Sequence, residues 1–297
     1  MPEDEDQDPT YHRVLKLNMK GADVKAAKDR LYAIGYLFAS TKSNFGPDTE
    51  RAVEDMQRNN GLNITGEIDQ LTWTTLFSDD VVRPKADDIP AHINKTAAAA
   101  IQRDLKGVSE VRKKIVLDCL KYAVDPYQVS KYPIAFYVRG GNAYNKDLTP
   151  NIMTKKKLDS YLNNSRYSEY TDGGRAEMMR AASEASGYTN MGCDCSGLCV
   201  GELKFFKVVN TGFDANANSL YSSYCKNTSN PLPGDMMWKS GHAGIYVGGG
   251  YCVEAAGGAY GLQMTKVSDR RIYNFVDHKI HKFSKWTAYG RWKMLKD

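Results

Sequence analysis

The stretch at residues 192–200, Gly-Cys-Asp-Cys-Ser-Gly-Leu-Cys-Val, most constrains how this chain can fold, because it joins a turn of small residues to a helix start. Asp194 is a residue type that caps helices, and the apolar run after Cys195 can form a buried helix. A cysteine at the first helical position meets the positive end of the helix dipole and unpaired backbone N–H groups, which favour the thiolate. We therefore predict that Cys195 is a nucleophile.

A thiol nucleophile needs a general base, and histidine is the commonest one. Of the five histidines in the chain, His242 has the most suggestive surroundings, because it begins two apolar runs joined by glycines, as in a β-hairpin. If the loop has an odd number of residues centred on Gly248, Glu254 lies directly opposite His242 on the same face. A carboxylate there would orient the imidazole, which completes an arrangement of cysteine, base and acid.

Three motifs in this region are found together in a known family: Asp-Cys-Ser-Gly-Leu at 194–198, Pro-Gly-Asp at 233–235 and Gly-His-Ala-Gly-Ile-Tyr-Val-Gly at 241–248. In combination they resemble the NlpC/P60 cysteine peptidases, which cut bacterial cell-wall peptides, and the resemblance covers residues 108–297. It implies that Cys195 is the nucleophile, His242 the base and Glu254 the third catalytic residue. Many members carry a histidine at the third position, so the acid is a departure from the family pattern.

Substrate-binding residues are also implied by the resemblance. Phe-Tyr-Val-Arg-Gly-Gly at 136–141 is similar to the Tyr-x-x-Gly-Gly stretch of the family, whose tyrosine lines the substrate cleft. This assigns substrate binding to Tyr137, and we assign it also to Asp194 and Ser196, which flank the nucleophile. Residues 142–191 are too long for a simple connection and contain several tyrosines, so we expect a partly helical insertion that borders the cleft.

Residues 14–78 form a separate helical unit in this interpretation. Its apolar residues repeat at helical spacing in three runs, which glycines and a Phe-Gly-Pro sequence separate, so three short helices are predicted. The register of these glycines and of Trp73 resembles the peptidoglycan-binding type 1 module. The resemblance implies binding to the cell wall and no catalytic role, although some members serve as pro-domains or scaffolds. Trp73 itself is expected in the core.

The predicted organisation has four parts: an acidic tail at 1–13, a peptidoglycan-binding domain at 14–78, a linker at 79–107 and an NlpC/P60 catalytic domain at 108–297. A helix is expected near the end of the linker, at 96–106. The fold class is α+β. We expect a small three-helix domain followed by a papain-like domain, in which helices pack against an antiparallel sheet built around the hairpin that contains Ile245 and Val253.

The charge distribution points to an anionic partner. Five of the first ten residues are acidic, whereas residues 266–297 hold nine lysines and arginines against three acids. Anionic wall polymers fit the family resemblance, no nucleic-acid motif is present, and a solvated basic face without a partner is an equal alternative. The sequence contains no run of 18 apolar residues, so we expect no membrane span. Its acidic start lacks the apolar core of a signal peptide.

The six cysteines allow two other interpretations. Cys193, Cys195 and Cys199 with His242 could bind zinc, but this spacing is not the usual Cys-x2-Cys knuckle and no second pair follows. Disulfides are not expected without a secretory signal, and a nucleophile must stay free. We therefore predict no metal and no cofactor, with Cys119, Cys199 and Cys252 as small core residues.

These observations predict a peptidoglycan hydrolase that cleaves an amide bond of the stem peptide through a cysteine thioester. The family implies an endopeptidase, most often at the bond after D-glutamate, with the muramoyl–alanine amide as the alternative. A wall hydrolase with a binding module and no signal peptide suggests a phage endolysin, which leaves the host cytoplasm through a holin, or a virion-associated lysin. An acyltransferase that uses the same triad and a catalytically dead wall-binding protein remain alternatives.

Overall fold

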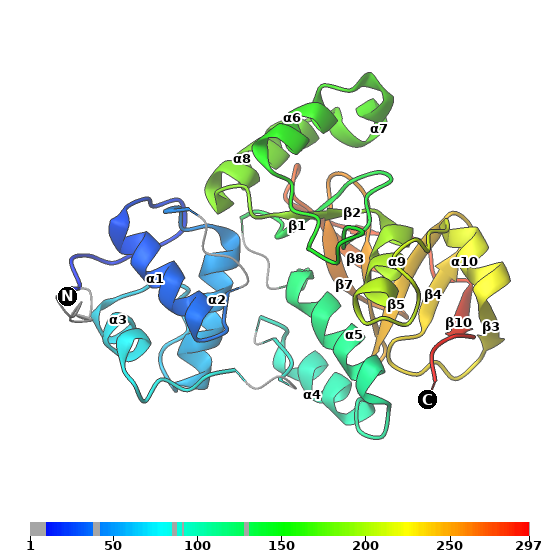
Figure 1. Ribbon diagram of the computed structural model, residues 1–297, viewed down its shortest axis with the longest axis horizontal. Helices are drawn as coiled ribbons and strands as arrows, with labels where there is room; N and C mark the ends of the chain where they lie inside the picture. Colours follow the sequence, from blue (N-terminus) through cyan, green and yellow to red (C-terminus); the bar gives the residue numbers. More distant parts are fainter. Residues whose placement is uncertain (1–9, 38–41, 85–87, 91, 128–130, 297) are drawn as a thin grey trace. The chain divides into compact units, whose positions relative to one another are not determined.

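The computed structural model describes residues 10–37, 42–84, 88–90, 92–127 and 131–296 (Figure 1). The predicted acidic tail therefore lies outside the described residues except for its last four. The chain divides into two compact units, one of residues 1–86 with 184–189 and one of residues 87–183 with 190–297. Helices and sheet are both present, as the α+β prediction requires.

The N-terminal unit contains three helices in residues 10–84, as predicted: α1 (Ala22–Ala33), α2 (Pro47–Asn59) and α3 (Gln70–Phe77). Proline at the first position of α2 loses no hydrogen bond there, and the Asp69 side chain caps α3 by accepting from the Thr72 N–H. The apolar stripes of the helices meet in one core. Trp73 belongs to this core, as expected.

A six-stranded antiparallel sheet forms the centre of the second unit, with the strand order β3-β10-β4-β5-β6-β7. The strands are β3 (Cys225–Thr228), β4 (Met236–Lys239), β5 (His242–Gly248), β6 (Tyr251–Ala255), β7 (Leu262–Lys266) and β10 (Ala288–Trp292). Two small sheets accompany it. One pairs β1 (Ala135–Tyr137) in parallel with β2 (Met191–Cys193), and the other pairs β8 (Arg271–Asn274) with β9 (Lys279–Lys282).

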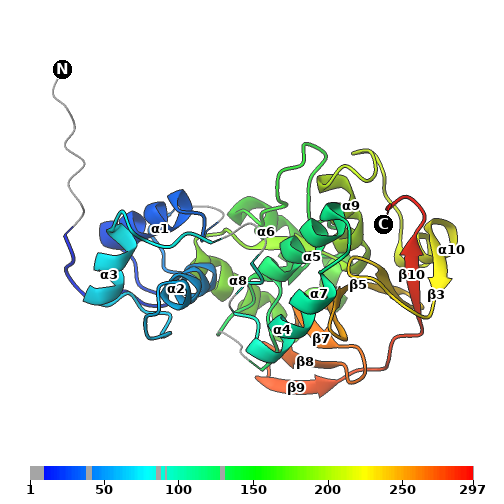
Figure 2. The same cartoon turned by 90° about the horizontal axis from the view of Figure 1, so that it is seen from below.

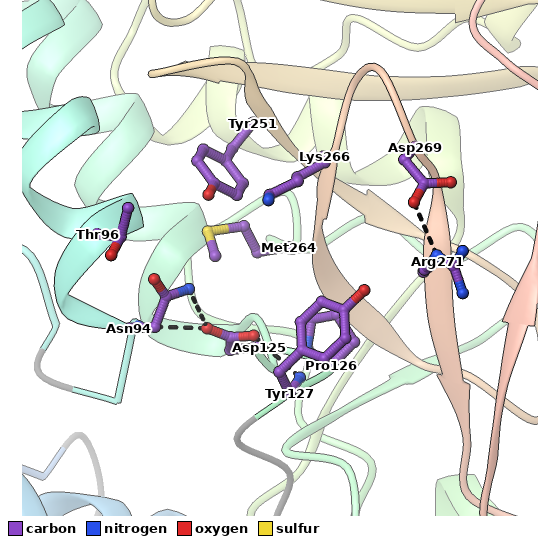
Figure 3. Close-up of a pocket in the computed structure, with 10 residues that line it drawn as sticks. All are labelled: Asn94, Thr96, Asp125, Pro126, Tyr127, Tyr251, Met264, Lys266, Asp269 and Arg271. Carbon is purple, nitrogen blue, oxygen red and sulfur yellow. Dashed lines mark hydrogen bonds and ion pairs between the residues drawn. The ribbon is translucent and has the colours of Figure 1, made fainter.

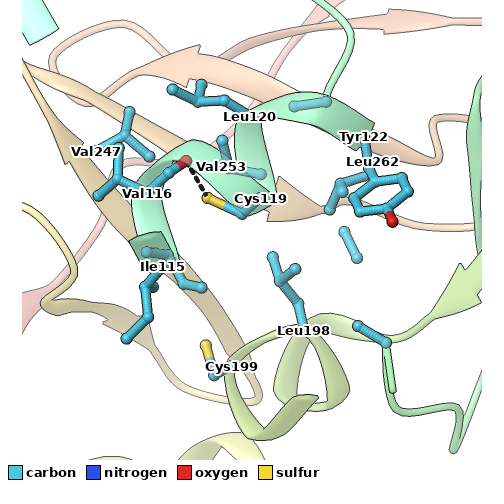
Figure 4. Close-up of a cluster of buried hydrophobic side chains, with 14 of the residues drawn as sticks. Ile115, Val116, Cys119, Leu120, Tyr122, Leu198, Cys199, Val247, Val253 and Leu262 are labelled. Atoms are coloured by element: carbon cyan, nitrogen blue, oxygen red, sulfur yellow. Dashed lines mark hydrogen bonds between the residues drawn. The ribbon is translucent and has the colours of Figure 1, made fainter. Parts of the chain in front are cut away.

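Helices cover one face of this sheet: α4 (Lys95–Asp104), α5 (Glu110–Tyr122), α9 (Cys195–Phe205) and α10 (Ala217–Tyr224). Along β5 the alternate residues Ala243, Ile245 and Val247 are buried against them, as the two-residue period of a strand requires. Figure 4 shows side chains of α5 and α9, among them Ile115, Cys119, Leu198 and Cys199, that meet Val247 and Val253 of the sheet. This packing holds the first turn of α9 near the start of β5.

The insertion at 142–191 contains helices, as expected: α6 (Lys155–Leu162), the 3-10 turn η1 (Ser165–Tyr167), α7 (Ser168–Thr171) and α8 (Arg175–Ser186). Figure 2 gives a second view of these elements. No helix in the described part of the chain is long and apolar enough to cross a membrane.

The predicted linker at 79–107 needs correction at its C-terminal end. Ile93, Ala97 and Ile101 are buried in the core of the second unit, and the Asn94 side chain caps α4. The hairpin turn after β5 packs closely against α4: a Cβ at Gly249 would lie only 2.7 Å from the Ala100 Cβ. Sequence alone did not show this, because alanine side chains give the helix only a weak apolar stripe. The glycine turn that allows the close approach of its backbone lies far away in the sequence.

Candidate active site

The helix start predicted at Cys195 is present. Cys195 is the first residue of α9, and Asp194 is its N-cap, with Oδ1 accepting from the Gly197 N–H at 2.7 Å. Cys195 is 5% exposed, and the Gly241 carbonyl oxygen lies 4.0 Å from its Sγ. The backbone N–H groups of the first helical turn point toward this end of the helix, where a developing oxyanion would be stabilised.

Asp194 uses both carboxylate oxygens within the protein. Oδ1 also accepts from the Ser196 hydroxyl at 3.0 Å, and Oδ2 accepts from the Gly140 N–H at 2.8 Å. The residue therefore ties the start of α9 to the loop after β1. These contacts give Asp194 and Ser196 a positioning function beside Cys195, and their substrate-binding role stays a prediction.

The loop after β1 lies directly against the first turn of α9. The Asp194 N–H donates to the Gly141 carbonyl at 2.8 Å, and the Ala143 N–H donates to the Gly197 carbonyl at 3.0 Å. A Cβ at Gly197 would lie 1.9 Å from the Gly141 carbonyl oxygen, so only glycine fits. This contact explains why a Gly-Gly motif and a Cys-Ser-Gly motif far apart in the sequence both belong to the site.

The hairpin of β5 and β6 brings His242 to Glu254, with 2.7 Å between Nε2 and Oε2. The register predicted for this hairpin was wrong, since Ile245 pairs with Val253, and this register places Gly244 opposite Glu254. Gly249 and Gly250 both have positive φ and form a two-residue turn, with a bulge before it, in place of an odd loop centred on Gly248. His242 is thus a diagonal neighbour on the same face and still reaches the carboxylate.

His242 interacts with two residues, since Cys195 and Glu254 each raise the pKa of its imidazole. Burial lowers the pKa of His242, but the interactions with Cys195 and Glu254 outweigh it and raise the pKa to about 9. Glu254 is fully buried, which alone would raise its pKa, yet the hydrogen bonds from His242 and Arg270 lower it to about 2. Because Nε2 faces Glu254, Nδ1 is the ring nitrogen left for the thiol.

Two further residues complete this side of the site, and the sequence interpretation missed both. Arg270 makes an ion pair with Glu254 and is 2% exposed. The indole of Trp286 stacks on the His242 ring, with centroids 5.2 Å apart and planes 9° apart. Neither lies in a motif near the cysteine or the histidine, and the only available signal was the basic composition of residues 266–297, which we assigned to the surface.

Tyr137 lies on β1, next to the strand that leads into Cys195. Its ring stacks on Tyr170 of the insertion at 5.4 Å, and Arg139 lies over the Tyr170 ring at 5.7 Å. Burial, with the nearby Cys195 and Asp194, raises the pKa of the Tyr137 hydroxyl well above its usual range, so the hydroxyl keeps its proton. The insertion therefore packs against Tyr137 through Tyr170, and the substrate-binding role of Tyr137 stays a prediction.

All six cysteines are buried and free. Cys119, Cys199 and Cys252 lie in the core as predicted, and Cys193, for which the sequence made no prediction, is buried as well. Burial raises the pKa of Cys119, Cys193 and Cys199 well above the usual thiol range. Within the described ranges, no group of three or more His, Cys, Asp or Glu side chains is arranged to hold a metal ion.

A cavity of about 260 Å³ lies apart from the three catalytic candidates. Figure 3 shows its lining, where Asn94 donates to the Asp125 carboxylate and Arg271 pairs with Asp269. A second cavity, of about 460 Å³, is lined in part by Trp286, Tyr246 and Tyr289. Cys195, His242 and Glu254 line neither cavity.

Comparison with known proteins gives two family matches. Residues 20–76 match the family of peptidoglycan binding domains, and residues 170–279 match the NlpC/P60 family. The second match contains Cys195, His242 and Glu254. No curated protein matches the chain.

Two solved structures show limited similarity. A fused Zn-dependent amidase/peptidase/peptidoglycan-binding domain-containing protein from Clostridium acetobutylicum shares 27% identity with a TM-score of 0.24, over 33% of this chain and 46% of that one. The Burkholderia AP3 phage endolysin shares 20% identity with a TM-score of 0.22, over 60% of this chain and 64% of that one. The chain thus spans less than two thirds of either protein, and superpositions this weak carry no argument about function. The family matches do: the chain joins a peptidoglycan-binding domain to a domain of the NlpC/P60 family.

Proposed function

We propose that this chain is a peptidoglycan hydrolase that cleaves an amide bond of the stem peptide through a cysteine thioester. The observation that carries the proposal is the hydrogen bond of His242 to the buried Glu254, together with the Cys195 thiol at the start of α9, which raises the pKa of the same imidazole. The two family matches support the same class of substrate, since one domain matches the family of peptidoglycan binding domains and the other matches a family of cysteine peptidases.

In the first half of the reaction, the Cys195 thiol gives its proton to His242, Sγ attacks the carbonyl carbon, and the N–H groups at the start of α9 stabilise the oxyanion. The C–N bond breaks as His242 gives its proton to the leaving amine, which leaves an acyl thioester. In the second half, His242 takes a proton from water, the hydroxide attacks the thioester carbon, and the C–S bond breaks to release a carboxylic acid. Glu254 keeps the imidazole oriented through both halves.

Within this class we propose an endopeptidase acting on the bond after D-glutamate, with the muramoyl–alanine amide as the alternative bond. We also propose that the chain works as a phage endolysin, which reaches the wall from the host cytoplasm through a holin, or as a virion-associated lysin. The basic surface at 266–297 would favour a wall with anionic polymers.

Digestion of purified walls tests the proposal. Walls of several stem-peptide types are incubated with the wild type, with Cys195→Ala and with Cys193→Ser, and the new termini are identified by mass spectrometry. The wild type and Cys193→Ser should create new amine and carboxyl termini at one amide bond, and Cys195→Ala should create none while it still binds walls. Cleavage by Cys195→Ala at the wild-type rate would refute the assignment. Products with an added amine in place of water would identify an acyltransferase.

A further inference from the structure

The carboxylate of Glu254 has more hydrogen-bond partners than the orientation of an imidazole requires. Besides His242, it accepts from Oγ1 of Thr265 at 2.8 Å. Arg270 donates to both oxygens, from Nε to Oε1 at 3.0 Å and from Nη2 to Oε2 at 2.5 Å. A planar guanidinium with two donors fixes the plane of a carboxylate as well as its position. Arg270 and Thr265 therefore fix the position of the carboxylate that His242 contacts.

Arg270 also balances the charge of this buried acid. An ionised carboxylate without a charged partner is costly inside a protein, and burial alone would raise the pKa of Glu254. Arginine supplies such a charged partner. Glu254 therefore remains an ionised acceptor when His242 is neutral as well as when it is protonated, which both halves of a two-step hydrolysis need.

The Trp286 ring restrains the imidazole from a different direction. Its stacking on His242 is nearly parallel, and the Arg270 guanidinium lies over the same indole with 4.6 Å from Cζ to the ring centroid. Space for the indole exists because residue 244 is glycine: a Cβ there would lie 3.1 Å and 3.2 Å from two atoms of the Trp286 ring. Stacking leaves the ring free to accept or release a proton at its edge, while it resists rotation out of the plane.

The segment that carries Trp286 is itself tied to Arg270 and to the sheet. Nη1 of Arg270 donates to the Ser284 carbonyl, and the Phe283 N–H donates to the Arg270 carbonyl at 2.8 Å. On the other side of Trp286, the Thr287 N–H donates to the Trp238 carbonyl at 2.9 Å. One arginine thus connects the carboxylate to the segment that holds the indole.

We propose that Arg270 and Trp286 are positioning residues, which together hold the His242 ring in the orientation that attack by Cys195 requires. This inference rests on the proposed function, because it takes His242 as the base. The ionisable groups that act on His242 are Cys195 from α9 and Glu254 from β6, with Arg270 behind Glu254.

The first test measures the His242 pKa directly by NMR on protein with labelled histidine, with the signal assigned by its loss in His242→Gln. Arg270→Gln removes the charge that balances Glu254, so the carboxylate should favour the imidazolium more strongly and the His242 pKa should rise. Arg270→Lys keeps the charge and should stay near the wild type. Arg271→Gln is the matched control, because the neighbouring Arg271 pairs with the half-exposed Asp269. An unchanged or lowered His242 pKa in Arg270→Gln would overturn the role of Arg270.

The second test concerns Trp286 and compares Trp286→Leu with Trp286→Phe on a soluble muropeptide. Loss of the stacking surface should lower kcat about 10- to 100-fold with little change in KM, and phenylalanine should restore most of it. The ring-current shift of the His242 protons should disappear in Trp286→Leu and persist in Trp286→Phe. Equal kcat in all three proteins, or a change in KM alone, would contradict a positioning role.

These readouts separate the two proposals. The NMR pKa and the ring-current shift do not depend on wall cleavage, so they decide the positioning role even if Cys195→Ala keeps its lytic activity and the proposed function fails. Conversely, normal loss of activity in Cys195→Ala with unaltered His242 signals in Arg270→Gln and Trp286→Leu would leave the function standing and remove this inference.

Discussion

Glu202 on α9 and Asp118 on α5 are both buried, and the charge of Asp118 acts on the Glu202 carboxyl group. Tyr144 donates a hydrogen bond to Asp118. Burial, with the negative charge of Asp118 as the next cause, raises the pKa of Glu202 well above its usual range. The pair lies among Cys119, Tyr122 and Cys199 in the core that positions α9, so its protonation affects the stability of the active-site scaffold.

Glu202→Gln should stabilise the second unit relative to the wild type, by an amount that grows as the pH rises. In the unfolded chain a glutamate titrates near about 4.3, whereas in the folded state Glu202 keeps its proton to higher pH. The stability that this proton contributes is complete below the unfolded pKa and is lost as the pH rises toward the folded pKa. Gln does not titrate and loses no stability in this way. The free energy of unfolding of Glu202→Gln should therefore increase relative to that of the wild type between about pH 5 and 8.

Urea titrations at several pH values check this, with alkylation of buried thiols as the probe of unfolding. Glu169→Gln, at an exposed carboxylate, is the control and should follow the wild type. A constant difference between Glu202→Gln and the wild type at every pH would show that the acid is ionised in the folded protein.

Glu254→Gln should move the alkaline limb of the activity profile to lower pH. The carboxylate contributes to raising the His242 pKa to about 9, so its removal makes the imidazolium lose its proton at lower pH. This direction is opposite to that expected of the His242 pKa in Arg270→Gln. Rates on a soluble muropeptide against pH, for the wild type, Glu254→Gln and Glu254→Ala, test it. Three superimposable profiles would remove Glu254 from the site.

Asp194→Ala should destabilise the start of α9 by about 0.5–2 kcal/mol, the usual cost of losing an N-cap. Because the same carboxylate holds the Gly140 N–H, kcat should fall together with stability. Asp194→Asn keeps one acceptor oxygen, so it can retain the cap to the Gly197 N–H but not the bond from the Gly140 N–H, and it should recover more of the stability than of kcat. Thermal unfolding and steady-state kinetics give the answer, and a rise in KM with unchanged stability would instead support the substrate-binding assignment.

A catalytic fragment that begins at Asp88 should hydrolyse soluble muropeptides normally but clear intact walls poorly, because the binding module raises the local substrate concentration without taking part in the chemistry. A fragment that begins at residue 96 should be less stable, since it lacks the buried Ile93 and the Asn94 cap of α4. Activity of both fragments and the full chain on both substrates decides this. Equal loss on the soluble peptide in the longer fragment would mean that the first domain shapes the active site.

Local signals predicted the parts of this protein that depend on neighbouring residues. A cap, a cysteine and an apolar run placed the start of α9, and helical spacing found α1, α2 and α3. The class of the fold and the family of both domains came from motifs of the same local kind.

Contacts between segments far apart in the sequence were not predictable in this way. Arg270 lies 16 residues from Glu254 and Trp286 lies further on, and no pattern marks either as a partner of His242. The hairpin register failed because a bulge beside a two-residue glycine turn shifts the pairing, and alternation of apolar residues does not show where a bulge falls.

The burial of all six thiols determines what happens to this protein when it unfolds. While the fold is closed, oxidants reach few of these sulfurs and no two of them are joined. If the chain unfolds where thiols are oxidised, they become exposed together and can pair at random, which traps misfolded species. Outside a reducing environment, unfolding of this protein should therefore be irreversible. The rate of unfolding then determines how long the protein stays active.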